Sequence, residues 1–205
     1  MRNLRLYLNF WLDGVLIILA DEAQRLNIPL IHFSTDYVFD GKKKGAYSEI
    51  DKTNPINIYG LSKRGGEQEI QNIHDKHLII RTAWVYYRNH CRSFYQTMCN
   101  LLKTKNEINV VDDEIENPTS ATFLAKEVYN IISQLDLNDD REGRWGMYHL
   151  VEDNAMSRYQ FAKKILSEIK TEGDKLDCQI NSISRCDYNH LANRPLNSVL
   201  NTEKI

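Results

Sequence analysis

The chain has 205 residues, of which 42% are hydrophobic and 26% charged, a balance typical of a globular protein. Its formal net charge is -2, and its longest run of positive charge, the lysines at 42–44, is too short for a nucleic-acid patch. Asp13 and Gly14 interrupt the apolar N-terminal stretch, which falls short of the roughly 20 apolar residues of a membrane span, so neither nucleic acid nor a membrane is expected as a partner.

The first half of the chain alternates helical and extended patterns. Residues 12–26 are expected to form a buried amphipathic helix, and the short apolar run 28–33 a strand of a sheet that is buried on both faces. The turn-rich stretch 40–57 is long for a connection, so it is expected to be a functional loop. A charged helix over 58–74 and a second buried strand over 77–83 follow.

The second half continues this alternation. A helix is predicted over 92–105 and a short strand over 108–111. Residues 120–135 have apolar side chains at helical spacing, and a strand over 147–151 precedes a helix over 158–170. Strands that alternate with helices predict an α/β fold with a mainly parallel sheet.

The remaining local signals are few. Ser157 is expected to cap the helix that begins at residue 158. Beyond residue 171 the chain is polar, and only 192–204 has an ordered-looking pattern. The cysteines form no C-x-x-C pair and have no histidine cluster at zinc spacing, so we expect no metal site, reduced thiols and a cytoplasmic location. They are Cys91, Cys99, Cys178 and Cys186.

Tyr59 and Lys63 carry the strongest chemical signal. They lie four residues apart in a predicted helix, so they share one face. A phenol with a pKa of about 10 is a poor proton donor at neutral pH, and a nearby ammonium group lowers that pKa. Such a pair suits proton transfer to a carbonyl oxygen while a hydride reaches the carbonyl carbon. Y-x-x-x-K alone is nevertheless a weak pattern, because many surface helices contain it by chance.

Thr35 adds a second signal upstream. Residues 34–41, S-T-D-Y-V-F-D-G, follow the strand predicted over 28–33, and α/β proteins build sites at the carboxyl ends of parallel strands. The Thr35 hydroxyl can donate a hydrogen bond to a substrate oxygen there. The alternative is an ordinary turn stabilised by that hydroxyl.

Six ordered segments resemble the dTDP-4-dehydrorhamnose reductase family of extended short-chain dehydrogenases/reductases. They are S-T-D-Y-V-F-D-G at 34–41, Y-G-L-S-K at 59–63, R-T-A-W-V-Y at 81–86, V-V-D-D-E-I-E-N-P-T-S-A at 110–121, W-G-M-Y-H at 145–149 and R-P-x-x-S-x-L-x-x-x-K at 194–204. The resemblance implies a partial Rossmann-like parallel sheet with helices over residues 1–105. It implies a small C-terminal substrate-binding region over 106–205.

The resemblance also implies an activity, the NADPH-dependent reduction of the 4-keto group of dTDP-4-dehydrorhamnose to dTDP-L-rhamnose. Thr35, Tyr59 and Lys63 match the catalytic set of the family. Tyr59 would give a proton to the C4 oxygen, Lys63 would lower the pKa of Tyr59 and hold the nicotinamide ribose, and Thr35 would bind the reacting oxygen. Phe33 matches a position that lines the cofactor site together with Tyr59 and Lys63.

On the substrate side, Asp36 and Trp84 match positions that contact the sugar nucleotide, as does Thr35. An aromatic face suits stacking on a sugar, although Trp84 could equally be a core residue at a strand end. We expect Arg194 to pair with the diphosphate, for which a guanidinium is well matched, with a surface salt bridge as the alternative. The resemblance leaves open NADH instead of NADPH, an associated Mg²⁺ ion and a homodimer.

The chain also departs from the family pattern. No G-x-x-G-x-x-G turn, the element that holds the cofactor pyrophosphate, occurs in it, so most of the cofactor site is expected to be missing. Glu114 stands where the family has Gln, Tyr87 where it has Gly, and Arg158 where Trp is common. Glu116 replaces a further Gly, and it would carry a conformational penalty if that position needs positive φ.

Two other functions stay open at the level of sequence. One is a non-catalytic fragment or regulatory subunit, for which the regulatory subunit of methionine adenosyltransferase is a family precedent. The other is a nucleotide-sugar epimerase or dehydratase, since these relatives share Y-x-x-x-K. The segments at 34–41 and 194–204 favour the reductase.

Overall fold

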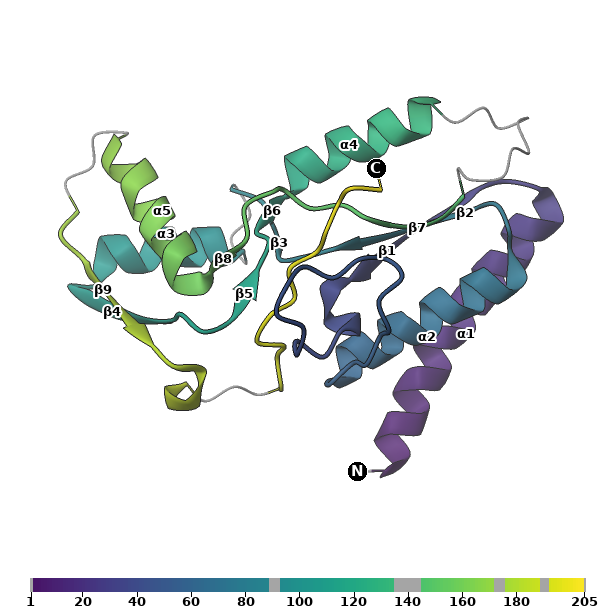
Figure 1. The fold of residues 1–205 in the computed structure, drawn as a ribbon, viewed down its shortest axis with the longest axis horizontal. Coiled ribbons are helices and arrows are strands. Elements are labelled where there is room, and N and C mark those ends of the chain that lie inside the picture. The colour runs from purple at the N-terminus through teal and green to yellow at the C-terminus, as the bar shows by residue number, and fades with distance from the viewer. Residues whose placement is uncertain (1, 89–92, 135–144, 172–175, 189–191, 205) are drawn as a thin grey trace.

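The computed structural model describes residues 2–88, 93–134, 145–171, 176–188 and 192–204, with side chains described from residue 14 onward (Figure 1). The helices are α1 (Arg2–Leu26), α2 (Ile58–Ile73), α3 (Phe94–Thr104), α4 (Ala121–Gln134) and α5 (Arg158–Thr171). The strands are β1 (Leu30–Thr35), β2 (His77–Thr82), β3 (Val85–Tyr86), β4 (Glu107–Val111), β5 (Ile115–Glu116), β6 (Thr119–Ser120), β7 (Gly146–His149), β8 (Met156–Ser157) and β9 (Gln179–Ile183). Short 3-10 helices follow two of these strands, at η1 (Asp36–Val38) and η2 (Arg185–Asp187).

The main sheet is parallel, with strand order β1-β2-β7. Thr35 pairs with Thr82, so the carboxyl ends of β1 and β2 meet at one edge of the sheet. Ile79 packs with Ala20 of α1 and Ile70 of α2, whereas its neighbour Ile80 packs with Leu124 of α4. The sheet therefore has helices on both faces, which confirms the predicted α/β class and explains why β2 is buried along its whole length (Figure 1).

A second group of elements lies beside this sheet. Strands β4 and β9 form a parallel pair, and helices α3 and α5 pack against it around Phe161 and Ile165. The short pair β5 and β8 is antiparallel, while β3 and β6 are parallel. The C-terminal segment runs between the two groups, and its Asn197 and Leu200 form bridges to Ile115 and Tyr47 (Figure 1).

Several predicted boundaries shift for physical reasons. Helix α1 already begins at Arg2, ahead of the predicted residue 12. It ends at Leu26 because Asn27 takes a left-handed φ of 52°, a common helix stop, and the following strand starts two residues later than predicted. Ser157 caps α5 as predicted, since its Oγ accepts a hydrogen bond from the Gln160 amide at 3.0 Å.

Strand β9 and the two-residue strands were not predicted. Q-I-N-S-I has no continuous apolar run, and its strand forms through register with β4 rather than through its own pattern. Among the predicted reduced thiols, Cys99, Cys178 and Cys186 are free, whereas Cys91 lies outside the described residues. No helix in the described ranges has the length and apolar character needed to cross a membrane.

Candidate active site

Thr35 ends β1 and turns the chain into η1. Its Oγ1 accepts a hydrogen bond from the Tyr37 amide at 3.2 Å and donates one to Asp36 Oδ1 at 3.0 Å. Both Thr35 and Asp36 are buried. The structure thus combines the two sequence interpretations, because the Thr35 hydroxyl stabilises a turn and also lies at the carboxyl edge of the sheet.

Gly60 allows helix α2 to pack closely against this turn. Asn57 caps the helix, with its Oδ1 accepting from the Gly60 amide at 2.8 Å. A Cβ at Gly60 would lie 2.0 Å from the Tyr37 carbonyl oxygen, so only glycine permits this close approach. As a result Tyr59 lies against Tyr37, with 6.2 Å between ring centroids, and the Tyr59 hydroxyl interacts with the Thr35 hydroxyl.

Burial and two neighbouring side chains set the pKa of Tyr59. Partial burial raises the pKa of Tyr59, the hydrogen bond with Thr35 opposes this shift, and the negative charge of Asp36 adds to it. Lys63 instead donates from Nζ to the Phe33 carbonyl oxygen at 2.7 Å, and burial lowers the pKa of Lys63. The Lys63 ammonium group is thus bound to a backbone carbonyl in this structure, and its lowering of the Tyr59 pKa stays a prediction.

Asp36 and Glu116 form a buried carboxyl pair beneath the site. Asp36 is 2% exposed, and burial together with the charge of Glu116 raises its pKa to about 8, a shift that the neighbouring hydroxyl groups of Ser198 and Thr35 oppose. Burial also raises the pKa of Glu116, opposed by the nearby charges of Arg158 and Arg194. Asp36 Oδ2 has no hydrogen-bond partner among the residues described.

Arg158 contacts both Glu114 and Glu116, and all three residues depart from the family pattern. Strands β5 and β8 pair with each other, and Glu116 lies opposite Met156. This pairing brings the start of α5 to the loop around residue 114. Arg158 Nη2 lies 3.4 Å from Glu116 Oε1, and its Nε lies 3.6 Å from Glu114 Oε2. Tyr37 Oη donates to the same Glu116 Oε1 at 3.3 Å, so this cluster reaches the neighbour of Tyr59.

The conformational penalty expected at Glu116 is absent. The described non-glycine residues with positive φ are Asn27 and Trp84, and Glu116 is a strand residue. Trp84 has a φ of 41°, a backbone conformation that costs about 1–3 kcal/mol for such a residue. The Arg158 guanidinium lies over its ring at 4.5 Å, and Phe161 packs edge-on against it at 5.2 Å. Trp84 therefore packs against the core, with Arg158 covering one face of its ring.

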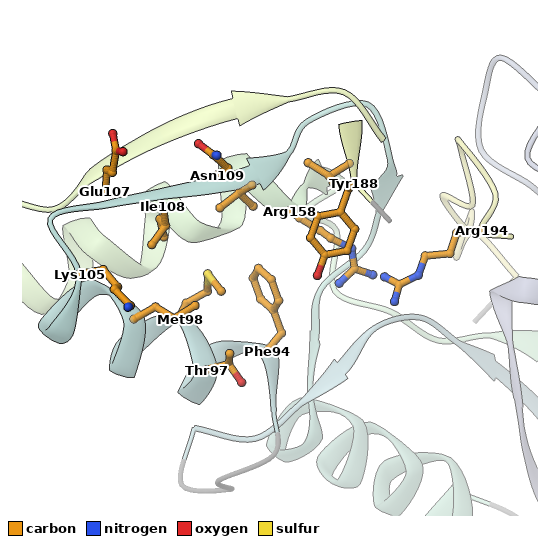
Figure 2. A pocket seen from close by; sticks show the side chains of 13 residues that line it. Phe94, Thr97, Met98, Lys105, Glu107, Ile108, Asn109, Arg158, Tyr188 and Arg194 are labelled. Carbon is orange, nitrogen blue, oxygen red and sulfur yellow. The ribbon is translucent and has the colours of Figure 1, made fainter. Parts of the chain in front are cut away.

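A cavity of about 650 Å³ opens between α3, β4 and the start of α5 (Figure 2). Phe94, Met98 and Ile108 give it an apolar wall, and Figure 2 shows Arg158 and Arg194 pointing toward each other at one end. Tyr188 also lines this end, and no motif in the sequence pointed to it. An apolar slot that ends in two guanidinium groups suits a ligand with a flat apolar part and an anionic part.

The predicted site residues thus fall into two groups. Thr35, Asp36, Tyr59, Lys63 and the half-exposed Phe33 gather at the carboxyl edge of β1. Arg194 lines the cavity, and Trp84 lies under Arg158, which also lines it; the charges of Arg158 and Arg194 act on Glu116, the neighbour of Asp36. No group of three or more potential metal-binding side chains (His, Cys, Asp or Glu) occurs in the described part of the chain.

Residues 14–205 match a family model described as the RmlD substrate binding domain. The dTDP-4-dehydrorhamnose reductase of Sinorhizobium fredii is 38% identical over 193 residues, which are 94% of this chain and 64% of that relative. The chain belongs to the dTDP-4-dehydrorhamnose reductase family. A second member of this family, from Escherichia coli K12, is 37% identical and is matched over 61% of its length. The chain therefore spans less than two thirds of these reductases.

Solved structures of family members agree with this assignment. A dTDP-4-dehydrorhamnose reductase from Bacillus anthracis in complex with NADP superposes with a TM-score of 0.81 at 32% identity, covering 92% of this chain and 62% of that one. A dTDP-glucose 4,6-dehydratase from Streptomyces venezuelae is only 14% identical, at a TM-score of 0.68. At that distance the likeness shows a shared fold alone.

Proposed function

We propose that this chain carries the proton-donating and sugar-nucleotide-binding parts of an NADPH-dependent reductase that converts dTDP-4-dehydrorhamnose to dTDP-L-rhamnose. The observation that supports this best is the meeting of Thr35, Tyr59 and Lys63 at one edge of a parallel sheet. The names of its relatives and the NADP bound to one similar structure point the same way. The segments 1–105 and 106–205 would supply the cofactor side and most of the substrate side.

The cofactor side fits the residues present. Phe33 and Tyr59 are 42% and 53% exposed, so an aromatic surface and a hydroxyl are accessible at this edge. The Lys63 ammonium donates to the Phe33 carbonyl oxygen, and it can exchange that contact for ribose hydroxyls. NADPH, when bound, supplies the hydride. Phe33, Tyr59 and Lys63 would hold its nicotinamide end.

Tyr59 and Thr35 would act on the carbonyl group. The Tyr59 hydroxyl would donate its proton to the C4 oxygen of the sugar as the carbonyl group is reduced. The Thr35 hydroxyl donates a hydrogen bond to the same oxygen and stabilises the negative charge that develops on it. Its fixed position at the end of β1 orients the carbonyl group toward Tyr59.

The cavity would hold the nucleotide. Its apolar wall suits the thymine base, and Arg194 together with Arg158 suits the diphosphate, which leaves the sugar near Trp84 and Asp36. A cytoplasmic location belongs to the same proposal and is supported by the free thiols of Cys99, Cys178 and Cys186. A homodimer, and NADH in place of NADPH, stay predictions.

Ligand titrations monitored by tryptophan fluorescence test this function. dTDP is expected to bind saturably to the 205-residue chain, and Arg194→Met should weaken that binding by roughly tenfold or more, the loss of one charge-assisted contact. Tyr59→Phe should leave dTDP binding unchanged. In a protein in which a glycine-rich cofactor-binding segment is joined to this chain, Tyr59→Phe should strongly reduce turnover of dTDP-4-dehydrorhamnose with NADPH. Binding of dTDP without turnover by that joined protein would favour the non-catalytic alternative, and absence of dTDP binding would contradict the proposal.

A further inference from the structure

A second cavity, of about 410 Å³, lies beside helix α2 and outside the candidate active site. Its lining comes from α2, the loop 49–53, strands β2 and β7 and the C-terminal Lys204. Among the described residues, it shares no lining residue with the cavity proposed for the nucleotide, and none of the catalytic or substrate-binding candidates lines it. The proposed function therefore leaves this cavity without a role.

Arg81 gives this cavity a buried hydrogen-bond donor. The side chain is 2% exposed, and its Nε and Nη2 each donate to a carboxylate oxygen of Glu67 at 2.8 Å. Its third nitrogen, Nη1, has no hydrogen-bond partner within the described ranges, although Arg81 lines the cavity. A buried N–H group without an acceptor is costly, so an acceptor from outside the protein is expected next to it.

Arg64 on α2 adds a second guanidinium group at the same carboxylate. Its Nη1 lies 3.5 Å from Glu67 Oε2, the oxygen that also accepts from Arg81 Nη2. Its Nε donates to Thr53 Oγ1 at 2.8 Å, whereas its Nη1, like that of Arg81, has no hydrogen bond among the described residues. One carboxylate cannot neutralise two guanidinium groups, so a positive charge remains at this end of the cavity.

The other charged residues of the lining do not cancel this charge. Lys52 and Lys204 add two exposed ammonium groups. Two carboxylates also line the cavity, but Asp51 is paired with Lys43 at 2.6 Å, and Glu49 Oε1 accepts from a backbone amide at 2.9 Å. The lining therefore contains four cations, and one of its two carboxylates is neutralised from outside, so positive charge is in excess.

An anion with several acceptor oxygens fits these groups. Guanidinium N–H groups form short charge-assisted hydrogen bonds with phosphate oxygens, and their planar fork matches the geometry of a phosphate group. A cation is disfavoured in this cavity, because the donors without partners are themselves positively charged.

We propose that this cavity binds a phosphate group, either inorganic phosphate or the phosphate of a small ester, through Nη1 of Arg81 and Nη1 of Arg64. Lys204 donates to the Met147 carbonyl oxygen at 2.7 Å, and it can exchange that carbonyl for a phosphate oxygen. The volume of the cavity leaves room for the small organic part of an ester. Because Arg64 also holds Thr53, an occupied site would bind the loop 49–53 more firmly to α2.

An NMR titration of the isotope-labelled 205-residue chain with inorganic phosphate tests this site, with sodium chloride at the same ionic strength as the reference. Saturable shifts are expected at the Nε–H signals of Arg64 and Arg81 and at the Thr53 amide. The same titration of Arg194→Met should give the same shifts, because that variant weakens phosphate binding in the nucleotide cavity alone. In a parallel titration with glycerol phosphate, tighter binding than that of phosphate identifies an ester as the ligand, and equal or weaker binding identifies the free ion.

Arg64→Gln should weaken phosphate binding roughly tenfold or more, because it removes one charged donor while Arg81 stays paired with Glu67. Arg25→Gln, which removes an exposed guanidinium group from α1, is the matched control and should retain the wild-type affinity. The spectrum of each variant shows whether it is folded. Shifts that do not saturate, or an unchanged affinity in folded Arg64→Gln, would overturn the inference and leave water as the partner of Arg81.

Binding of dTDP separates this site from the proposed function. Arg64→Gln should bind dTDP as wild type does, since Arg64 lies outside the nucleotide cavity. Wild-type protein that binds phosphate at Arg64 and does not bind dTDP would overturn the proposed function and support this site. Wild-type protein that binds dTDP without phosphate-dependent shifts at Arg64 would overturn this site and leave the proposed function intact.

Discussion

Arg158 has several distinct roles near the site. It neutralises two carboxyl groups that are almost wholly buried, covers the face of Trp84, and borders the cavity. Removal of one partner from a buried ion cluster is far more costly than loss of a surface pair, because the remaining charges are left in a poorly solvated environment. The stability of this region therefore depends strongly on one guanidinium group.

Arg158→Leu is accordingly expected to lower the free energy of unfolding by roughly 3 kcal/mol, measured by urea denaturation. The double variant Arg158→Leu/Glu116→Gln should recover part of this loss. Arg25→Leu is the matched control: its ion pair with Glu22 is at the surface, and its loss should change stability by less than about 1 kcal/mol. Equal losses at Arg158 and Arg25 would contradict the buried role.

Sequence alone identified some of these residues and not others. Thr35, Tyr59 and Lys63 could be found because each lies at a fixed distance from a strand end or within one helix. Arg158 was noticed only as a departure from a family pattern. Its contacts with Glu114 and Glu116 depend on the pairing of β5 with β8, and two-residue strands leave no periodic signal in a sequence.

At the scale of elements, helix α2 is held to the sheet by a buried ion pair. Arg81 on β2 donates from Nε and Nη2 to the two carboxylate oxygens of Glu67, each at 2.8 Å, and Ser34 of β1 donates to Glu67 Oε1 at 2.6 Å. These bonds connect both strands to the helix that carries Tyr59. The position of Tyr59 relative to the sheet therefore depends on Glu67.

Glu67→Gln should cost about 3 kcal/mol of unfolding free energy, because Arg81 would remain buried without its counter-charge. Glu22→Gln on the exposed face of α1 is the control and should be nearly neutral. Thermal or urea denaturation measures both. A loss at Glu67 no larger than that at Glu22 would show that the pair does not hold the helix.

Gly60 offers a second prediction about the same helix. A methyl group there would meet the Tyr37 carbonyl oxygen, so Gly60→Ala should force α2 outward and lower stability by about 1–3 kcal/mol, despite the better helix propensity of alanine. Gly14→Ala in α1 meets no atom within 4 Å, so it should be neutral or slightly stabilising. Equal effects at the two glycines would contradict the close approach seen at Tyr37.

At the scale of the whole molecule, the buried His149 and the partly buried His32 are both held in their neutral form. Burial lowers the pKa of His149 and that of His32 to about 4 each. Below pH 6.5 these two histidines take up protons in the unfolded chain, whereas in the folded protein they stay neutral until the pH approaches 4. Their contribution to stability is complete above pH 6.5 and is lost as the pH falls toward 4.

His149→Gln isolates this contribution. At pH 7 the variant should be less stable than wild type because it loses packing. Relative to wild type it should gain roughly 3 kcal/mol as the pH falls from 7 to 4, since it has no histidine to protonate. Urea denaturation over this range measures the difference. A difference that does not depend on pH would contradict a neutral buried His149.

The C-terminal segment contacts both groups of elements that surround the site. Gly41 lies against Pro195, Leu200 bridges Tyr47, and Asn197 bridges Ile115. These contacts join residues that are far apart in the chain. During synthesis, residues 195–200 leave the ribosome after the residues that they contact. The sheet edge with Thr35 and Tyr59 can therefore begin to fold early in synthesis, whereas the cavity with Arg194 can be completed only once the final residues have emerged.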